Sequence, residues 1–324
     1  MNGTVARIAL LALLLPAAPP APAQGWPSKP IRLIVPFPAG ATTDFLARVV
    51  ADNIGPALGQ TVVVENRAGA AGNVGTDLVA KSAPDGYTVV MGTVAQTISE
   101  TLYTKLPFSI QRDLAPVALV ARVPNVMEVH PSVPAKTVKE YIALARARPG
   151  QIAYGSFGTG SSSHFAGALL ALETKTEMVH VPYKGGGPVL MANVAGEVPI
   201  HFGGVPPTLP HIRAGKLKAL AVTASRRTAF LPDVPTVAEA LKIPEYDITV
   251  TFGMLAPAAT PREIVDRMYE EIGRIVATAD FKSKLAALGT DEAPLLTPAQ
   301  MGQWLTRETA RWKRFVEMTG IRSD

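Results

Sequence analysis

The sequence has 324 residues, no cysteine and a formal net charge of +5, and aromatic residues make up 6% of it. Without thiols, the chain has no disulfides, cysteine nucleophiles, thiolate metal sites or cysteine-linked lipid anchor. Nucleic-acid binding would need a basic stripe interleaved with aromatic side chains, whereas the basic residues here are scattered. We therefore interpret the positive charge as a solvated surface with a weak attraction for anions and expect no nucleic-acid partner.

The N-terminus has the pattern of a secretory signal. Arg7 precedes the apolar run 8–15, and Ala21-Pro22-Ala23 provides an Ala-x-Ala cleavage site. The run is far shorter than the ~20 residues that a membrane-spanning helix needs, and a retained anchor is the alternative interpretation. We predict a signal peptide over 1–23 that is cleaved on export to the periplasm.

Strand-like and helix-like segments alternate along the rest of the chain. Strands are predicted at 31–35, 61–64, 87–91, 117–120, 125–129, 151–154, 178–181, 217–222 and 248–254. Helices are predicted at 44–58, 75–81, 138–147, 164–172, 188–195 and 261–277. Two helix starts carry capping patterns, namely Thr137 with Glu140 three residues later, and Thr260 before Pro261. This alternation indicates an α/β architecture with largely parallel sheets.

The length predicts two domains, and no Ser/Gly-rich linker separates them. We therefore expect domains that are joined by crossing strands, with a hinge of a few residues absorbing their relative motion. Domain 1 is predicted to be discontinuous, over 24–124 plus 251–324, and domain 2 to cover 125–250.

Two loops of small residues, 36–44 and 156–164, each follow a predicted strand and lead into a predicted helix. Such a loop leaves backbone N–H groups free at the positive end of the helix dipole, where an anion is stabilised. The two loops lie in different predicted domains. The pattern therefore predicts one small anionic ligand held between two domains.

Further motifs run along nearly the whole sequence after the signal. They are Trp-Pro-Ser-Lys-Pro-Ile-Arg at 26–32, Val-Val-Val-Glu-Asn-Arg-Ala-Gly at 62–69, Ala-Pro-Asp-Gly-Tyr at 83–87, Val-His-Val-Pro-Tyr-Lys-Gly-Gly at 179–186, Pro-His-Ile-Arg-Ala-Gly at 210–215 and Leu-Pro-Asp-Val-Pro-Thr at 231–236. In this order and spacing the chain resembles the substrate receptors of tripartite tricarboxylate transporters, also called Bug-type extracytoplasmic solute-binding proteins.

The resemblance implies a two-domain clamshell of type II-like periplasmic binding-protein fold, each domain a mostly parallel sheet flanked by helices. It implies a small carboxylate in the interdomain cleft, recognised largely by backbone amides of the two loops, and delivery to integral-membrane transporter subunits. It also implies a monomer without catalysis, cofactor or metal. The chain departs from the family pattern at Ala41, Phe165, Ala168 and Gly203, and the loss of acidic residues at Ala168 and Gly203 favours a ligand without an amino group.

The ligand site is predicted to comprise residues of both loops and of three other segments, of which the first follows the predicted strand 87–91. These are Phe37, Ala39, Gly40, Ala41, Thr42, Thr43, Asp44, Thr93, Ala95, Gln96, Ser156, Gly158, Thr159, Gly160, Ser161, Ser162, Ser163, His164, Tyr183, Gly203 and Gly204. Asp44 either orients a ligand group or a water, or bonds its own loop. His164 either donates to the ligand or caps and packs its helix. Phe37 is expected to pack on an apolar part of the ligand.

Two rival functions remain open. Ser163 beside His164 is a pattern for an exported serine hydrolase, but adjacent residues do not make a triad and the sequence has no Gly-x-Ser-x-Gly elbow. The five histidines match no metal-ligand spacing. The second rival is the same clamshell acting as a ligand-presenting sensory subunit for a membrane signalling protein, which sequence does not separate from transport.

Overall fold

The computed structural model describes residues 25–322, so the predicted signal peptide lies outside the described residues. The strands are β1 (Ile31–Val35), β2 (Val62–Asn66), β3 (Thr88–Thr93), β4 (Leu114–Val129), β5 (Ile152–Ser156), β6 (Met178–Pro182), β7 (Ile200–Gly204), β8 (Lys218–Val222), β9 (Thr249–Pro257) and β10 (Asp291–Glu292). The helices are α1 (Thr42–Leu58), a 3₁₀ turn (Ala70–Gly72), α2 (Asn73–Ala80), α3 (Val94–Leu102), α4 (Ile110–Asp113), α5 (Val138–Ala147), α6 (Ser162–Thr174), α7 (Gly186–Ala195), α8 (Val205–Arg213), α9 (Val237–Leu241), α10 (Arg262–Val276), α11 (Ala279–Ala287) and α12 (Pro298–Thr319).

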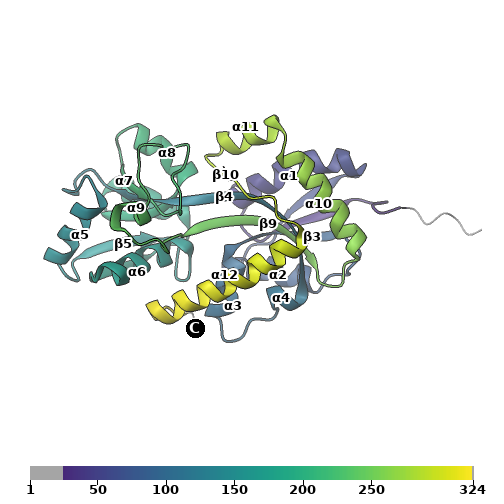
Figure 1. Cartoon of the computed structure of the whole chain (residues 1–324), viewed down its shortest axis with the longest axis horizontal. Coiled ribbons are helices and arrows are strands. Elements are labelled where there is room, and N and C mark those ends of the chain that lie inside the picture. The colour runs from purple at the N-terminus through teal and green to yellow at the C-terminus, as the bar shows by residue number, and fades with distance from the viewer. Residues whose placement is uncertain (1–24, 323–324) are drawn as a thin grey trace, which may run out of the picture.

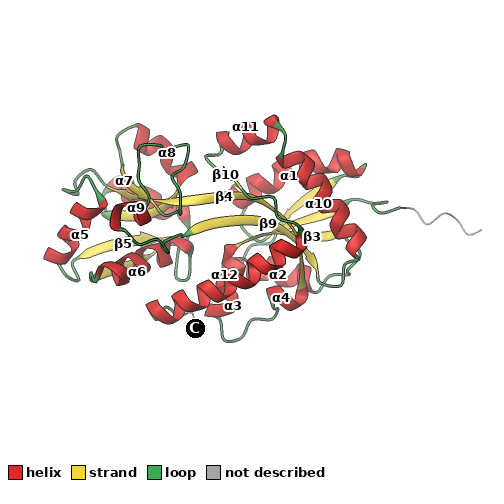
Figure 2. Cartoon of the chain, in the orientation of Figure 1, coloured by secondary structure: helices red, strands yellow, loops and turns green. Residues whose placement is uncertain are grey.

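A single mixed sheet with the strand order β2-β1-β3-β9-β4-β7-β5-β6 runs through the molecule. At one end β1 is parallel to β2 and β3, and we call these strands with their helices the first lobe. At the other end β5 is parallel to β6 and β7, and these form the second lobe. The antiparallel strands β4 and β9 connect the two groups, with helices on both faces (Figures 1 and 2).

The expected α/β architecture with crossing strands is therefore confirmed. The predicted strands 117–120 and 125–129 prove to be parts of β4, one strand of 16 residues. The predicted domain boundaries, after 124 and after 250, fall inside β4 and β9, and they stay predictions. Thr137 is confirmed as an N-cap, because its side chain accepts a hydrogen bond from Glu140 N at 3.1 Å. The reciprocal bond of a capping box is missing, since the Glu140 carboxylate accepts from Lys136 N instead. The Thr260 prediction is wrong: α10 starts one residue later than expected, so Pro261 is its N-cap.

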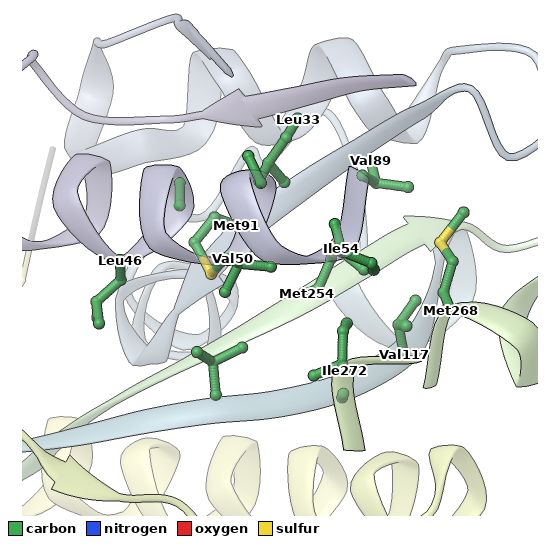
Figure 3. Packing of buried hydrophobic residues seen from close by; sticks show 14 of the residues in the cluster. Leu33, Leu46, Val50, Ile54, Val89, Met91, Val117, Met254, Met268 and Ile272 are labelled. Atoms are coloured by element: carbon green, nitrogen blue, oxygen red, sulfur yellow. The ribbon is translucent and has the colours of Figure 1, made fainter. Parts of the chain in front are cut away.

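In the first lobe, α1 packs on the sheet through one apolar stripe. Leu46, Val50 and Ile54 recur at helical spacing, so they lie on a single face. They are buried with Leu33 of β1 and Met91 of β3, and Figure 3 shows these side chains gathered between the helix and the strands. This packing fixes the start of α1, and with it the loop that precedes the helix.

The C-terminal helix α12 belongs to both lobes. Its first half contributes Met301 and Leu305 to an apolar cluster with strands of the first lobe. Its second half contributes Trp312, which is fully buried and packs edge-on against Phe165 of α6 with ring centroids 5.3 Å apart. The helix α3 also packs into this second-lobe cluster, through Ile98 and its neighbours. Neither helix was predicted from the sequence, and both fix how the lobes sit together.

Candidate functional site

The two predicted loops occupy equivalent places in the two lobes. Loop 1 (36–44) follows β1, the central strand of the first parallel group, and loop 2 (156–164) follows β5, the central strand of the second. In loop 1, Gly40 N donates to Asp44 Oδ2 at 3.0 Å. In loop 2, Gly160 N donates to His164 Nδ1 at 3.1 Å. Both glycines have a positive φ, of 80° and 75°, so the same local turn opens both helices.

Asp44 is buried and uses both carboxylate oxygens within the protein. Oδ2 accepts from Gly40 N and from Arg48 Nε at 3.1 Å, and Oδ1 accepts from Arg48 Nη2 at 3.0 Å and Asn66 Nδ2 at 2.9 Å. Burial raises the pKa of Asp44, but the hydrogen bonds from Arg48, Gly40 and Asn66 outweigh it and leave the pKa below its usual value. These contacts favour the interpretation that Asp44 orders loop 1 rather than touching a ligand.

The N-terminus of α1 has free donors. Its N-cap residue is Ala41, which offers no side-chain acceptor. Within residues 25–322, the backbone N–H groups of Thr42, Thr43 and Asp44 donate to no acceptor. Unpaired N–H groups at a helix N-terminus bind anions, because they combine donor geometry with the positive end of the dipole.

Loop 2 is more strongly bonded to itself. Ser161 is the N-cap of α6 and accepts from His164 N at 3.3 Å. Ser163 Oγ accepts from Phe157 N at 2.8 Å, and Ser156 Oγ accepts from Gly158 N at 3.1 Å. In the described part of the chain, no acceptor pairs with the N–H groups of Thr159, Ser162 and Ser163. In the first turn of α6, loop 2 therefore has free backbone N–H groups at Ser162 and Ser163 only, whereas the His164 N–H is already bonded.

His164 is largely buried, and its ring accepts a backbone N–H. Burial, with a smaller effect of His180, lowers the pKa of His164 to about 3. The ring is therefore neutral near pH 7, with its proton on Nε2 because Nδ1 is an acceptor. A cavity of about 610 Å³ lies beside α6 and is lined by His164, Tyr154 and Met318 among others. His164 is the one residue of loop 2 among those that line it, and no residue of loop 1 does.

Thr93 and Gln96 open a helix, where the sequence predicted a ligand loop. Thr93 N donates to Gln96 Oε1 at 2.6 Å and Ala95 N donates to Thr93 Oγ1 at 3.0 Å, which makes a capping box at the start of α3. Gln96 is fully buried, and among the described residues its Nε2 has no partner. A Cβ placed on Gly72 would lie 2.6 Å from this Nε2 and 3.2 Å from the Phe37 ring, so Gln96 and Phe37 converge.

The helix α3 reaches from loop 1 to loop 2. Its first turn holds Gln96 beside Phe37, and its last residue, Leu102, lies so close to Gly160 that a Cβ there would collide with the Leu102 side chain. About six residues of helix separate the two contacts, which corresponds to roughly 9 Å. The helix α3 therefore contacts a residue of each loop, at opposite ends of its length.

The remaining predicted residues gather around loop 2. Tyr183 N donates to Ser156 O at 3.1 Å. Gly204 lies opposite Asn125 in the pairing of β7 with β4, and Asn125 Nδ2 donates to Ser162 Oγ at 3.2 Å. Sequence reasoning missed Asn125, although it begins the predicted strand 125–129. It is 1% exposed and links a crossing strand to the first residue of α6.

A family profile described as "Tripartite tricarboxylate transporter family receptor" matches residues 46–321. The chain belongs to this family. It is 36% identical to "Protein BugT" of Bordetella pertussis over 324 residues, which cover 99% of each protein. The resemblance noted in the sequence is thus confirmed.

Solved structures of this family share the fold. "R. palustris Rpa4515 with adipate" is 34% identical, with a TM-score of 0.83 over 92% of this chain and 99% of that one. "MatC (Rpa3494) from Rhodopseudomonas palustris with bound malate" is 30% identical, with a TM-score of 0.78 over 90% and 100%. "Structure of periplasmic binding protein BugD" is 29% identical, with a TM-score of 0.80 over 92% and 100%. The periplasmic binding-protein fold is therefore confirmed, and receptors of this family are periplasmic solute-binding proteins. Between residues 25 and 322, no helix is long and apolar enough to cross a membrane.

Proposed function

We propose that the protein is an extracytoplasmic receptor that captures a small carboxylate between loop 1 and loop 2. The observation that carries the proposal is the start of α1, where Thr42, Thr43 and Asp44 present unpaired N–H groups and Ala41 provides no cap. A carboxylate that accepts such bonds gains roughly 1.5–3 kcal/mol from each. The adipate and malate in two family structures support the same ligand class.

Loop 2 completes the site when the lobes close. Two of its free donors, Ser162 N and Ser163 N, lie in the first turn of α6, and Asn125 holds the first residue of that helix against β4. A ligand that reaches both loops binds only the closed arrangement, so binding shifts the population toward closure. Neutral N–H donors suit this mechanism because the empty site then holds no unpaired buried charge.

The partners and location follow from the family. We propose that the predicted signal peptide exports the chain to the periplasm, and that the loaded receptor delivers its ligand as a monomer to integral-membrane transporter subunits. The family membership supports this role, since its receptors serve tripartite transporters. Ligand capture itself involves no covalent chemistry and is proposed to proceed without catalysis.

The test is a binding titration of the purified protein with adipate and malate, with adipamide as the uncharged control. We expect at least one of the two acids to raise the melting temperature, because ligand at ~100 times its Kd stabilises the folded state by about 2.7 kcal/mol. Adipamide should give no shift. Binding of adipamide as tight as that of adipate would contradict recognition of a carboxylate.

A proline scan at helix position N1 tests the donors. Thr42→Pro removes a free N–H at a position that proline tolerates, and Ala41 before it is already extended, at ψ 160°. We expect a 10- to 100-fold loss of affinity, from one lost charge-assisted bond, with an unchanged melting temperature. The matched control is Ala279→Pro, at position N1 of α11, which should leave affinity unchanged. Equal affinities for wild type and Thr42→Pro would rule out this donor.

A further inference from the structure

A buried acid–imidazole pair lies beneath loop 2, outside the site described above. Glu128 of β4 and His201 of β7 face each other in the strand register. The distance between His201 Nδ1 and Glu128 Oε1 is 2.6 Å, and the two side chains are 1% and 0% exposed. Neither residue was singled out in the sequence.

Burial disfavours the charged form of both members of the pair. Burial raises the pKa of Glu128 well above its ordinary value and lowers the pKa of His201 to about 3. This favours the neutral forms, in which a Glu128 hydroxyl donates to His201 Nδ1. Among the described residues, Glu128 Oε2, His201 Nε2 and Thr208 Oγ1 have no partner.

Gly203 is fitted tightly against this pair. A Cβ on Gly203 would lie 2.6 Å from Glu128 Oε1, 2.7 Å from Thr208 Oγ1 and 3.0 Å from His201 Cε1. Real Cβ atoms do not approach other atoms so closely, so any side chain at 203 would displace the pair. The glycine therefore belongs to the same packed unit.

The pair supports loop 2 through an aromatic contact. Phe157, the second residue of loop 2, packs edge-on against the His201 ring, with centroids 5.3 Å apart and planes at 76°. The backbone of Phe157 is bonded on both sides, because its N–H donates to Ser163 Oγ at 2.8 Å and its carbonyl accepts from Gly185 N at 3.1 Å. A shift of the Phe157 ring would therefore move the loop.

We propose that the Glu128–His201 pair is a positioning element for loop 2, and that it acts through the ring of Phe157. The two loops are then ordered by different devices. Loop 1 depends on the Asp44–Arg48 ion pair and on the Asn66 amide, whereas loop 2 depends on an acid–imidazole pair that is buried behind it. Neither Glu128 nor His201 touches the ligand in this arrangement.

The test uses amide hydrogen exchange of the full protein without ligand, so it does not depend on the proposed function. We expect His201→Leu to speed exchange of the Phe157 and Gly160 amides at least 10-fold, while the Gly40 amide of loop 1 is unchanged. Glu128→Gln keeps a donor for His201 Nδ1 and should change loop 2 less than 3-fold. Ile200→Val is the matched control, since it weakens the same strand by roughly 1 kcal/mol without touching the pair.

A double-mutant cycle separates positioning from general destabilisation. Phe157→Ala should itself speed loop 2 exchange, and adding His201→Leu should then increase it by less than 2-fold. If His201→Leu does not fold, His201→Gln takes its place, because it retains an acceptor for Glu128 but removes the ring beneath Phe157. The proposal is overturned if the variant leaves loop 2 unchanged, if it speeds loops 1 and 2 equally, or if its effect persists without the Phe157 ring.

Discussion

His164 and His180 stack ring on ring, with centroids 3.6 Å apart and planes at 5°. His164 accepts from Gly160 N through Nδ1, and His180 Nε2 is 2.7 Å from Ser156 Oγ. The stack therefore ties both ends of loop 2 to β6. Two protonated rings at this distance would repel each other, so the stack disfavours protonation of both rings together.

The first prediction concerns acid pH. The folded-state pKa of His164 is about 3, well below the value of about 6.5 expected in the unfolded chain. The unfolded state therefore binds more protons below pH 6.5, and stability that is complete above this pH is lost as the pH falls. We expect His164 to reduce the free energy of unfolding by about 1 kcal/mol at pH 5, after solvent screening.

Calorimetry at pH 7.5 and pH 5 measures this loss. His164→Asn retains an acceptor for Gly160 N but does not titrate, so its melting temperature should fall less than that of the wild type over the same interval. His201 also has a lowered pKa, so its protonation lowers the melting temperature at pH 5 in both proteins. This effect cancels when the two proteins are compared. An identical fall in both proteins would show that His164 titrates normally in the folded state.

The second prediction concerns the bare helix start at Ala41. Ala41→Ser places a hydroxyl where it accepts from Asp44 N, as Ser161 accepts from His164 N in loop 2. A new N-cap stabilises a protein by about 1 kcal/mol, but it occupies a donor that the carboxylate needs. We expect a higher melting temperature together with weaker ligand binding. If the melting temperature and the ligand affinity both rise, the ligand does not bind at this helix start.

The third prediction compares the two loop glycines. Both adopt a positive φ, which costs an alanine roughly 1–2 kcal/mol. Gly40 has open space where its Cβ would be, whereas a Cβ on Gly160 would collide with Leu102. Gly160→Ala should therefore destabilise the protein more than Gly40→Ala, by an additional 1–3 kcal/mol for overpacking.

Chemical denaturation of the two variants gives this difference. Adding Leu102→Ala to Gly160→Ala relieves the collision, so the double variant should cost less than the sum of the single variants. Strict additivity would mean that loop 2 and α3 are not in contact in solution.

The fourth prediction concerns Asp44. Asp44→Asn removes the negative charge that Arg48 and Gly40 N bind. We expect the free energy of unfolding to fall by about 1–3 kcal/mol. Ligand affinity should fall at least 10-fold, because loop 1 loses its order. Asp266→Asn is the control. This substitution breaks the ion pair between Asp266 and Arg262, which are also four residues apart. The Arg262 side chain is 92% exposed and that of Asp266 is 44% exposed, so the free energy of unfolding should change by less than 0.5 kcal/mol.

Much of the fold could be predicted because its signals are local. Hydrophobic periodicity and capping patterns involve only a few consecutive residues. They were therefore enough to predict the alternation of strands and helices, the Thr137 cap and the two small-residue loops. The sequence also showed the family, since its motifs keep their order along the chain. The helix α3 was not predicted, because Thr93 and Gln96 are polar and follow a strand, which is also typical of a ligand loop.

The roles of single side chains were decided by tertiary structure. Asp44 and His164 look equally suited to bind a ligand in the sequence, but Asn66 and Gly40 occupy the first, and Gly160 and His180 occupy the second.

By itself, then, the sequence determined the order of strands and helices, the two loops and the family. Only the tertiary structure decided which side chains of those loops are already bonded, and it alone paired Glu128 with His201, 73 residues apart in the chain. Such pairs leave no pattern in the sequence, because they form where distant strands meet and burial, not neighbouring residues, sets their charge and their partners.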